Sequence, residues 1–173
     1  MKTLGAILAG GQARRFGSDK AHALYKGVRL VECVAAALNA QCAQVVVCGR
    51  GEEGFACIPD RPGADMGPLG GLNAALHYAA KNGFSHVLSA GVDAPNLPYD
   101  LAQTLSGDGP AIVQSKPVIG LWPAELADDL EMFLSQEGSA LYGFAETVGA
   151  RRIAFDPPLM NVNSPKDLPQ SRN

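Results

Sequence analysis

The sequence lacks an excess of positive charge and any long apolar run, and both absences narrow its possible functions. Its 173 residues carry 14 Lys and Arg against 17 Asp and Glu, for a net charge of −3. A domain that binds nucleic acid over a broad surface is usually basic, so that class is disfavoured. No stretch approaches the roughly 20 apolar residues of a membrane helix. Glycines and charges soon interrupt the apolar run Leu4–Ala9, so we expect no signal peptide, no membrane association and a soluble, cytoplasmic protein.

Cysteine and histidine are scarce, and their spacing does not indicate a metal centre. The sequence has 4 Cys and 3 His, with no C-x-x-C pair and no His at zinc-like spacing. We therefore expect reduced, mostly buried thiols, and histidines with structural or surface roles. No Ser–His or Cys–His constellation is visible, so covalent hydrolase chemistry is unsupported. These residues are Cys33, Cys42, Cys48, Cys57, His22, His77 and His86.

What the sequence does contain is an alternation of short apolar runs and helical patterns, with 47% hydrophobic residues. This fits a single domain with a proper core, which we place over residues 1–173. The alternation predicts an α/β fold of three layers, a mostly parallel mixed sheet with helices on both faces, and the tight link Ser115–Pro117 indicates one antiparallel strand. The expected strands are Leu4–Ala9, Gln44–Cys48, His86–Ala90, Ala111–Gln114, Val118–Trp122 and Arg152–Phe155. The expected helices are Val28–Asn39, Pro68–Lys81, a short one after Pro98, Ala124–Leu134 and Ala140–Val148, with a final turn capped by Ser164.

The stretch LAGGQARRFGSDKA follows the first expected strand and combines glycines with positive charge. It fits neither the P-loop pattern G-x-x-x-x-G-K-[ST] nor the dinucleotide pattern G-x-G-x-x-G. A longer loop is left, whose glycine backbone can approach a base or sugar and whose Arg14, Arg15 and Lys20 can hold phosphates. The alternative is a basic surface loop without a ligand.

Two aspartates come directly after apolar runs, at the edge of the sheet where ligands bind in open α/β folds. Asp93, in GVDAP, follows the strand His86–Ala90, and Asp60 follows Ile58-Pro59. One carboxylate together with substrate phosphates is a common way to hold Mg²⁺, although an Asx-type turn before a proline is an equally ordinary use of Asp93. The glycines of MGPLGGL precede a helix, whose N-terminus attracts anions.

Together these segments resemble the molybdenum cofactor guanylyltransferases, within the wider nucleotidyltransferase family that shares a Rossmann-like fold. The resemblance covers nearly the whole chain and rests on five motifs in order. They are LAGGQARRFGSDKA, IPD at Ile58–Asp60, GPLGGL at Gly67–Leu72, GVDAP at Gly91–Pro95 and NVNSPKDL at Asn161–Leu168. The resemblance implies transfer of GMP from Mg·GTP to the phosphate of molybdenum-bearing molybdopterin, with release of pyrophosphate.

The resemblance also implies roles for single residues. Arg15, Lys20 and Asp93 would be the catalytic residues: the two cations would hold phosphates, and the carboxylate would hold Mg²⁺. Contacts to the nucleotide are implied for Leu8, Ala9, Gly10, Gly11, Lys20, Asp60, Gly67, Pro68, Leu69 and Asp93. Asn161 and Asn163 are associated with the molybdopterin end of the cleft. GTP and the molybdopterin cofactor are the implied substrates, with transient contacts to cofactor-insertion proteins or molybdoenzymes, and no nucleic acid partner.

Three positions depart from the family's pattern. Cys48 stands where the family often has an asparagine that contacts the nucleotide, Arg29 stands where a proline is common, and the link Ser115–Pro117 is short. Because Cys48 ends a β-branched strand, it lies either at the ligand edge beside the nucleotide or in the core as a packing residue. The short link is expected to alter the grip on the pterin substrate.

Other functions remain open at the level of sequence. Guanine selectivity depends on a few hydrogen bonds, so a cytidylyltransferase for the same cofactor is the nearest alternative. A sugar-phosphate or small-phosphate nucleotidyltransferase is another, although the short C-terminal half leaves little room for a separate sugar domain. A non-catalytic nucleotide-binding protein is the alternative of a different class, and the presence of Lys20 and Asp93 argues against it.

Overall fold

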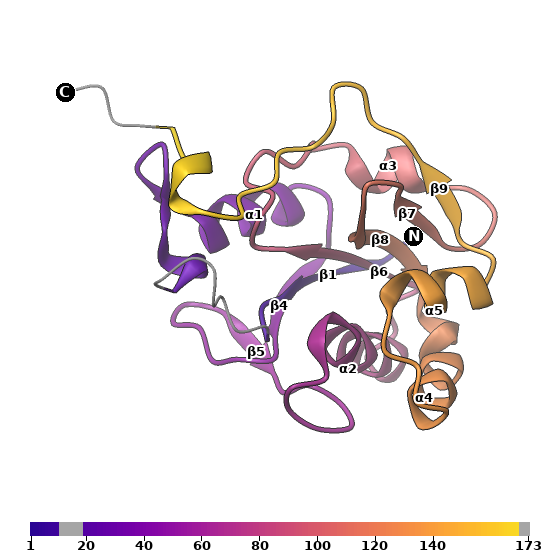
Figure 1. Cartoon of the computed structure of the whole chain (residues 1–173). Coiled ribbons are helices and arrows are strands. Elements are labelled where there is room, and N and C mark those ends of the chain that lie inside the picture. The colour runs from indigo at the N-terminus through magenta and orange to yellow at the C-terminus, as the bar shows by residue number, and fades with distance from the viewer. Residues whose placement is uncertain (11–18, 170–173) are drawn as a thin grey trace.

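The computed structural model describes residues 1–10 and 19–169, which form a central sheet with helices on both faces (Figure 1). Within these residues the main sheet has the strand order β5-β4-β1-β6-β8-β7-β9, and β2 pairs with β3 in a separate hairpin. The strands are β1 Thr3–Leu8, β2 Leu24–Tyr25, β3 Val28–Arg29, β4 Gln44–Cys48, β5 Ala56–Ile58, β6 His86–Gly91, β7 Ala111–Val113, β8 Lys116–Pro123 and β9 Arg151–Ile153. The helices are α1 Leu30–Asn39, α2 Gly67–Lys81, α3 Leu101–Leu105, α4 Ala127–Ser135 and α5 Leu141–Thr147, with 3-10 turns η1 Lys20–His22, η2 Ala124–Leu126 and η3 Pro165–Asp167.

Strand β1 lies inside the sheet and sets the positions of its neighbours. It pairs in parallel with β4 on one side and with β6 on the other, and Leu8 at its end is opposite both Cys48 and Gly91. Strand β8 is antiparallel to β6 and β7, while β7 and β9 are parallel. The expectation of a mostly parallel mixed sheet is therefore confirmed. The in-register ends of β1, β4 and β6 bring the loops that follow them to one edge.

The two faces of the sheet carry separate hydrophobic layers because successive side chains of a strand point to opposite faces. Leu4, Ala6 and Leu8 of β1 pack with α2, α4 and α5, whereas Ile7 packs with α1 and α3. Figure 1 shows these two groups of helices on opposite sides of the strands. The three-layer arrangement is thus confirmed. In the described part of the chain, no helix has the length and apolar character needed to span a membrane.

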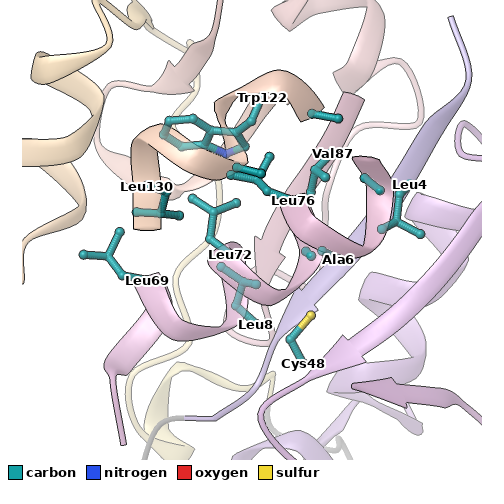
Figure 2. Close-up of a cluster of buried hydrophobic side chains, with 14 of the residues drawn as sticks. Leu4, Ala6, Leu8, Cys48, Leu69, Leu72, Leu76, Val87, Trp122 and Leu130 are labelled. Atoms are coloured by element: carbon teal, nitrogen blue, oxygen red, sulfur yellow. The ribbon is translucent and has the colours of Figure 1, made fainter. Parts of the chain in front are cut away.

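A buried tryptophan packs in the hydrophobic layer between the sheet and α2. Trp122 is fully buried and stacks on Phe144, with ring centroids 5.7 Å apart. Its indole Nε1 donates a hydrogen bond to Ser89 Oγ at 3.0 Å, and that hydroxyl donates to Val118 O at 2.8 Å. The polar atoms of this pair are therefore satisfied inside the core, as buried donors must be. Figure 2 shows Trp122 in the same cluster as Leu76 and Leu130.

Several element boundaries differ from the sequence-based expectation. Helix α1 begins at Leu30, because Val28–Arg29 pairs with Leu24–Tyr25 across a turn in which Lys26 and Gly27 have φ of 50° and 81°. Strand β5 was not expected, since it has only three residues and lies at the edge of the sheet. The segment Ala124–Leu126 forms a 3-10 turn ahead of α4.

The side chain of Cys48 lies in the core and not at the ligand edge. It is fully buried in the layer under α2, next to Leu8 and in the same cluster as Leu72 (Figure 2). Burial raises the pKa of this thiol to about 12, so the thiol stays protonated. The packing interpretation is therefore correct, and the placement of this side chain beside the nucleotide is wrong.

The expectation of mostly buried thiols is also wrong in part. Cys33 and Cys42 are half-buried, and Cys57 is exposed.

Replacing Cys48 by asparagine is expected to destabilise the fold without tightening nucleotide binding. The larger amide would enter an apolar, filled layer and lack partners there, which costs about 1–3 kcal/mol of the free energy of unfolding. Chemical denaturation measures this loss, and Cys48→Ala, which adds no polar group, is the control and should cost less. An unchanged free energy of unfolding together with tighter GTP binding would contradict the core placement.

Candidate functional site

Two adjoining hollows lie at the edge where β1, β4, β5 and β6 end. The first has a volume of about 320 Å³ and the second about 330 Å³, and Arg50 borders both. The first is lined by Leu8, Ala9, Asp19, Lys20, Ala21, Arg50, Gly91, Val92, Asp93 and Val118. The second is lined by Gly49, Arg50, Gly51, Cys57, Ile58, Pro59, Asp60 and Ala64. Loops from four strands thus form one extended cleft of two parts.

The loop after β1 forms one wall of the first hollow. Leu8 and Ala9 line it, and the Ala9 amide donates to the Cys48 carbonyl at 3.0 Å, which continues the sheet pairing by one residue. Gly10, the next residue, lies against the carboxylate of Asp60. The predicted residues Gly11 and Arg15 lie outside the described residues, so their roles stay predictions.

Lys20 borders the same hollow from a short, well-anchored turn. It begins η1, which is capped by Asp19 through a hydrogen bond from the Ala21 amide at 3.2 Å. Both Asp19 oxygens accept hydrogen bonds from Arg50, at 2.8 and 2.5 Å. These bonds lower the pKa of Asp19. Arg50 therefore fixes the turn that presents Lys20 to the cleft.

A buried glutamate contacts both the turn that carries Lys20 and the side chain of Arg50. The Glu52 side chain is only 2% exposed and lies 2.7 Å from His22 Nε2, 3.1 Å from Arg29 Nη1 and 3.3 Å from Arg50 Nη2. Arg29, one of the three positions noted as departures from the expected pattern, thus has a partner in this chain. The sequence analysis missed both Arg50 and Glu52. Arg50 pairs with Asp19 and Glu52 pairs with His22, and each partner is about thirty residues away in the sequence.

Asp60 lies in a cradle of glycines at the junction of β1, β4 and α2. A Cβ at Gly10 would come within 2.7 Å of Asp60 Oδ2, and a Cβ at Gly49 within 2.6 Å of Oδ1. Gly70 of α2 approaches the same side chain, with an ideal Cβ 3.2 Å from Asp60 Cβ. Asp60 Oδ1 is buried and has no hydrogen-bond partner among the described residues. Burial raises the pKa of Asp60, with a further contribution from Asp65.

Asp93 faces the first hollow from the loop after β6. Its Oδ2 lies 3.2 Å from Lys116 Nζ, and its side chain is 23% exposed. Its Oδ1 is buried and has no hydrogen-bond partner among the described residues. An ideal Cβ on Gly91 would lie 2.9 Å from this oxygen, so the carboxylate folds back over a glycine.

The C-terminal segment meets Asp93 directly. The Val162 amide donates to the Asp93 carbonyl at 2.7 Å, and Asn161 Oδ1 accepts from Lys116 Nζ at 3.0 Å. Asn163 is exposed, and its amide donates to Asp167 Oδ2 at 2.9 Å, within the capped turn that follows Ser164. The structure thus brings Asn161 to the expected metal carboxylate, while Asn163 belongs to the cap of η3.

The residues at the start of α2 lie further from the hollows than expected. Gly67 and Pro68 begin this helix but line neither hollow, and Leu69 is buried in the core. Gly70, one residue further on, is the position that touches Asp60. A nucleotide contact by Gly67–Leu69 stays a prediction, and the helix contributes to the described site mainly by supporting Asp60.

Lys116 was missed as a functional residue. It opens β8, and the sequence analysis treated it only as part of a hairpin link. Burial lowers the pKa of its ammonium, Asp93 opposes that shift, and the charge of Lys20 adds to it. A lone lysine before a proline gives no sequence signal for such a position, because the signal is its distance to Asp93.

The chemistry of the site suits an anionic ligand with a divalent cation. Among residues 1–10 and 19–169, no group of three His, Cys, Asp or Glu side chains is arranged to hold a metal by itself. Mg²⁺ in such a site is usually held by one or two carboxylates and by substrate phosphates. Asp93 Oδ1 is an unpartnered acceptor of this kind, and Lys20 supplies positive charge to the same hollow. The residues present therefore fit Mg²⁺ bound together with a phosphate ligand.

Fold and site together define a class of α/β domains that bind nucleotides at the carboxyl ends of parallel strands. Residues 5–147 match the sequence model described as the MobA-like NTP transferase domain. The chain belongs to this family.

Curated relatives agree over the full length. The chain is 35% identical to the molybdenum cofactor guanylyltransferase of Cereibacter sphaeroides, in an alignment that covers 100% of this chain and 97% of that protein. It is also 35% identical to the molybdenum cofactor guanylyltransferase of Acidiphilium cryptum, over 94% of this chain and 90% of that protein.

Solved structures share the fold. The molybdopterin-guanine dinucleotide biosynthesis protein A of Archaeoglobus fulgidus superposes with a TM-score of 0.75 at 22% identity, covering 95% of this chain and 94% of that one. A nucleotidyl transferase of Methanothermobacter thermautotroptrophicus gives a TM-score of 0.73 at 19% identity, covering 96% and 94%. The expected Rossmann-like nucleotidyltransferase fold is thus confirmed.

The close approach at Gly49 predicts a steric defect at the site. Gly49 has φ of 89°, and a Cβ there would lie 2.6 Å from Gly10 Cα. Gly54 has nearly the same φ, 86°, but no neighbour within 4 Å of an added Cβ. Gly54→Ala should therefore cost only the left-handed backbone penalty of about 1–2 kcal/mol, while Gly49→Ala should cost clearly more and weaken nucleotide binding.

Thermal unfolding and nucleotide titration of these two variants measure both effects. Equal losses of stability for Gly49→Ala and Gly54→Ala would show that the contact with Gly10 and Asp60 is unimportant.

Proposed function

We propose that this protein is a molybdenum cofactor guanylyltransferase. It transfers GMP from Mg·GTP to the phosphate of molybdenum-bearing molybdopterin and releases pyrophosphate. The observation that carries the proposal is the placement of Asp93, with its unpartnered buried oxygen, in the same hollow as Lys20. The names of full-length relatives at 35% identity support the choice of substrates.

The nucleotide would lie along the two hollows. In the first, Lys20 holds the phosphates, and the resemblance implies Arg15 as a second cation. Mg²⁺ bound at Asp93 would neutralise charge on the phosphates. In the second, Asp60 and the backbone around Gly49 hold the nucleoside. Arg50, at the junction of the hollows, keeps Lys20 in place through Asp19.

The chemistry of Asp60 favours guanine over cytosine. An ionised carboxylate is an acceptor only, and the Watson–Crick edge of guanine offers it two donors, N1–H and the N2 amino group. Cytosine offers only its N4 amino group on that edge. Asp60 Oδ1 is buried without a partner among the described residues, and a base that donates to this carboxylate would offset that cost. GTP is therefore the preferred substrate.

The reaction needs no covalent bond to the protein. A phosphate oxygen of molybdopterin attacks the α-phosphorus of GTP, the bond between the α-phosphorus and its bridging oxygen breaks, and pyrophosphate leaves. This nucleophile is already ionised near pH 7, so the site requires no strong general base. Positioning and electrostatic stabilisation supply the rate enhancement. Lys20 and Arg15 stabilise the leaving group, and Asn161, beside Asp93, marks the end where the acceptor binds.

GTP is a cytoplasmic metabolite, so the reaction belongs in the cytoplasm. The product must pass to proteins that insert the cofactor, and transient contact with them is expected. The protein itself needs no nucleic acid partner.

Asp93→Asn is expected to leave the fold intact and to cut turnover by about 100-fold or more, the usual effect of removing a strong electrostatic group from a transition state. Pyrophosphate release at matched Mg²⁺ measures the turnover. Asp100→Asn is the control, because Asp100 is exposed at the start of α3 and its side chain makes no capping hydrogen bond. Near-normal turnover of Asp93→Asn would exclude Asp93 as the principal metal ligand.

Lys20→Ala is expected to weaken the binding of GTP more than that of GMP. A hydrogen bond to a charged group contributes about 1.5–3 kcal/mol, and GMP lacks the β- and γ-phosphates that Lys20 would contact. Calorimetric titration of both nucleotides measures the difference, with Lys81→Ala at the exposed end of α2 as the control. Equal losses for GTP and GMP would place the ammonium away from the β- and γ-phosphates.

A further inference from the structure

Lys116 is a buried cation at the meeting point of three chain segments. It is 8% exposed and opens β8, next to the loop that carries Asp93. A buried ammonium is costly unless each of its three donors finds an acceptor. Here three acceptors are present: Asp93 Oδ2 at 3.2 Å, Asn161 Oδ1 at 3.0 Å and the Met160 carbonyl at 3.4 Å. The ammonium of Lys116 thus has an acceptor for each of its donors, and it joins the three segments from inside the protein.

This junction fixes the direction of two groups that a substrate would meet. Because Lys116 occupies Asp93 Oδ2, the other oxygen, Oδ1, is the one left without a partner among the described residues. Because Lys116 also binds Asn161 Oδ1, the amide of that exposed side chain keeps its NH₂ group as the end available to a ligand. One cation therefore selects which atom each neighbour presents.

The same contacts bind the C-terminal segment to the cleft. The Val162 amide donates to the Asp93 carbonyl at 2.7 Å, and the Val162 side chain packs against Leu30 of α1. Figure 1 shows this segment, in yellow, crossing from β9 back toward α1. Without Lys116, the two segments would keep this backbone bond and the bond from the Met160 amide to Asn96 Oδ1 at 3.1 Å, but no hydrogen bond or ion pair would join the side chains of Asp93 and Asn161 among the described residues.

We propose that Lys116 is a positioning residue that couples the cation-holding carboxylate Asp93 to the acceptor-end amide Asn161. The proposal rests on the proposed function. The positive charge also balances Asp93 before a ligand arrives. The carboxylate then has a weakened attraction for a free divalent cation and a fixed orientation for one that arrives with its nucleotide.

The test compares Lys116→Met, which removes the charge but keeps the length of the chain, with Lys116→Gln, which keeps a donor. In Lys116→Met we expect turnover to fall roughly 10–100-fold, as it does when other residues that orient metal ligands are replaced. We also expect the KM for molybdopterin to rise, while the Kd for GTP should change little. The affinity for free Mn²⁺ should rise at least about fivefold, because one unit of nearby positive charge is gone. The electron paramagnetic resonance signal of free Mn²⁺ measures this affinity. Lys116→Gln should recover part of the turnover, and Lys81→Met should match the wild type.

The possible outcomes distinguish failure of the positioning role of Lys116 from failure of the proposed guanylyl transfer. A parallel loss of GTP binding and Mn²⁺ binding in Lys116→Met would mean that the lysine binds phosphate or only supports the fold, and would overturn the positioning role. Unchanged Mn²⁺ affinity and turnover would overturn it as well. If the wild type shows no guanylyl transfer, the proposed function fails, while the rise in Mn²⁺ affinity of Lys116→Met still tests the coupling of Lys116 to Asp93. Should Lys116→Met fail to fold, the same measurements on Lys116→Gln decide, with a smaller change in the same direction expected.

Discussion

The parallel register of β1 with β4 and β6 is the constraint on which the rest of the structure depends. Leu8 is opposite Cys48 on one side and Gly91 on the other, so three strands end at the same level. The loops that follow are then forced into one edge, where they enclose the two hollows. Residues far apart in the sequence, such as Lys20 and Asp93, share a cleft only because this register holds. The apolar layers on both faces hold the register, since a shift by one residue would turn Leu4 and Leu8 away from α2.

Charged groups at this edge have specific neighbours, and two of the buried carboxylate oxygens without a hydrogen-bond partner among the described residues belong to residues that line the cleft. Glu52 is surrounded by His22, Arg29 and Arg50, and Lys116 is satisfied by three oxygens. Four buried side-chain oxygens have no hydrogen-bond partner among the described residues: Asp60 Oδ1 and Asp93 Oδ1, whose residues border the cleft, and also Glu52 Oε2 and Asn73 Oδ1. Native proteins keep such atoms mainly where a ligand or ion completes them. In the proposed function, Asp60 would meet the nucleoside and Asp93 would meet the phosphates with their cation.

The sequence predicted the elements with long, regular patterns and failed where the pattern was short. The β-branched run was enough to predict β4, and the leucine spacing was enough to predict α2. The end of α2 could be predicted from Asn82. The hairpin of β2 and β3 was not found, because only two residues pair on each side and a positive φ at Lys26 makes the turn. The edge strand β5 was missed for the same reason, since three residues with little burial carry no periodicity.

For the site, position along the chain was a better guide than side-chain direction. The position of Asp60 and Asp93 beside the cleft could be predicted because each follows a strand at the ligand edge, and the resemblance to known enzymes pointed to Asn161, which contacts Lys116. Cys48 also ends a strand, yet its side chain points into the core. Whether the last side chain of a strand faces a hydrophobic layer or the ligand edge depends on the twist of the sheet and on the helix that covers it, here α2. Arg50, Glu52 and Lys116 were missed because their roles depend on pairings across the fold. No local spacing encodes such pairings.

The central claim is that this cleft transfers GMP to the phosphate of molybdenum-bearing molybdopterin. The most direct measurement is to incubate the protein with that acceptor, Mg²⁺ and an equimolar mixture of GTP, CTP and ATP, and to identify the product by mass spectrometry while following pyrophosphate. The account predicts the guanine dinucleotide form of the cofactor, with one pyrophosphate released per molecule formed. A cytosine or adenine adduct, or nucleotide binding without any adduct, would contradict it.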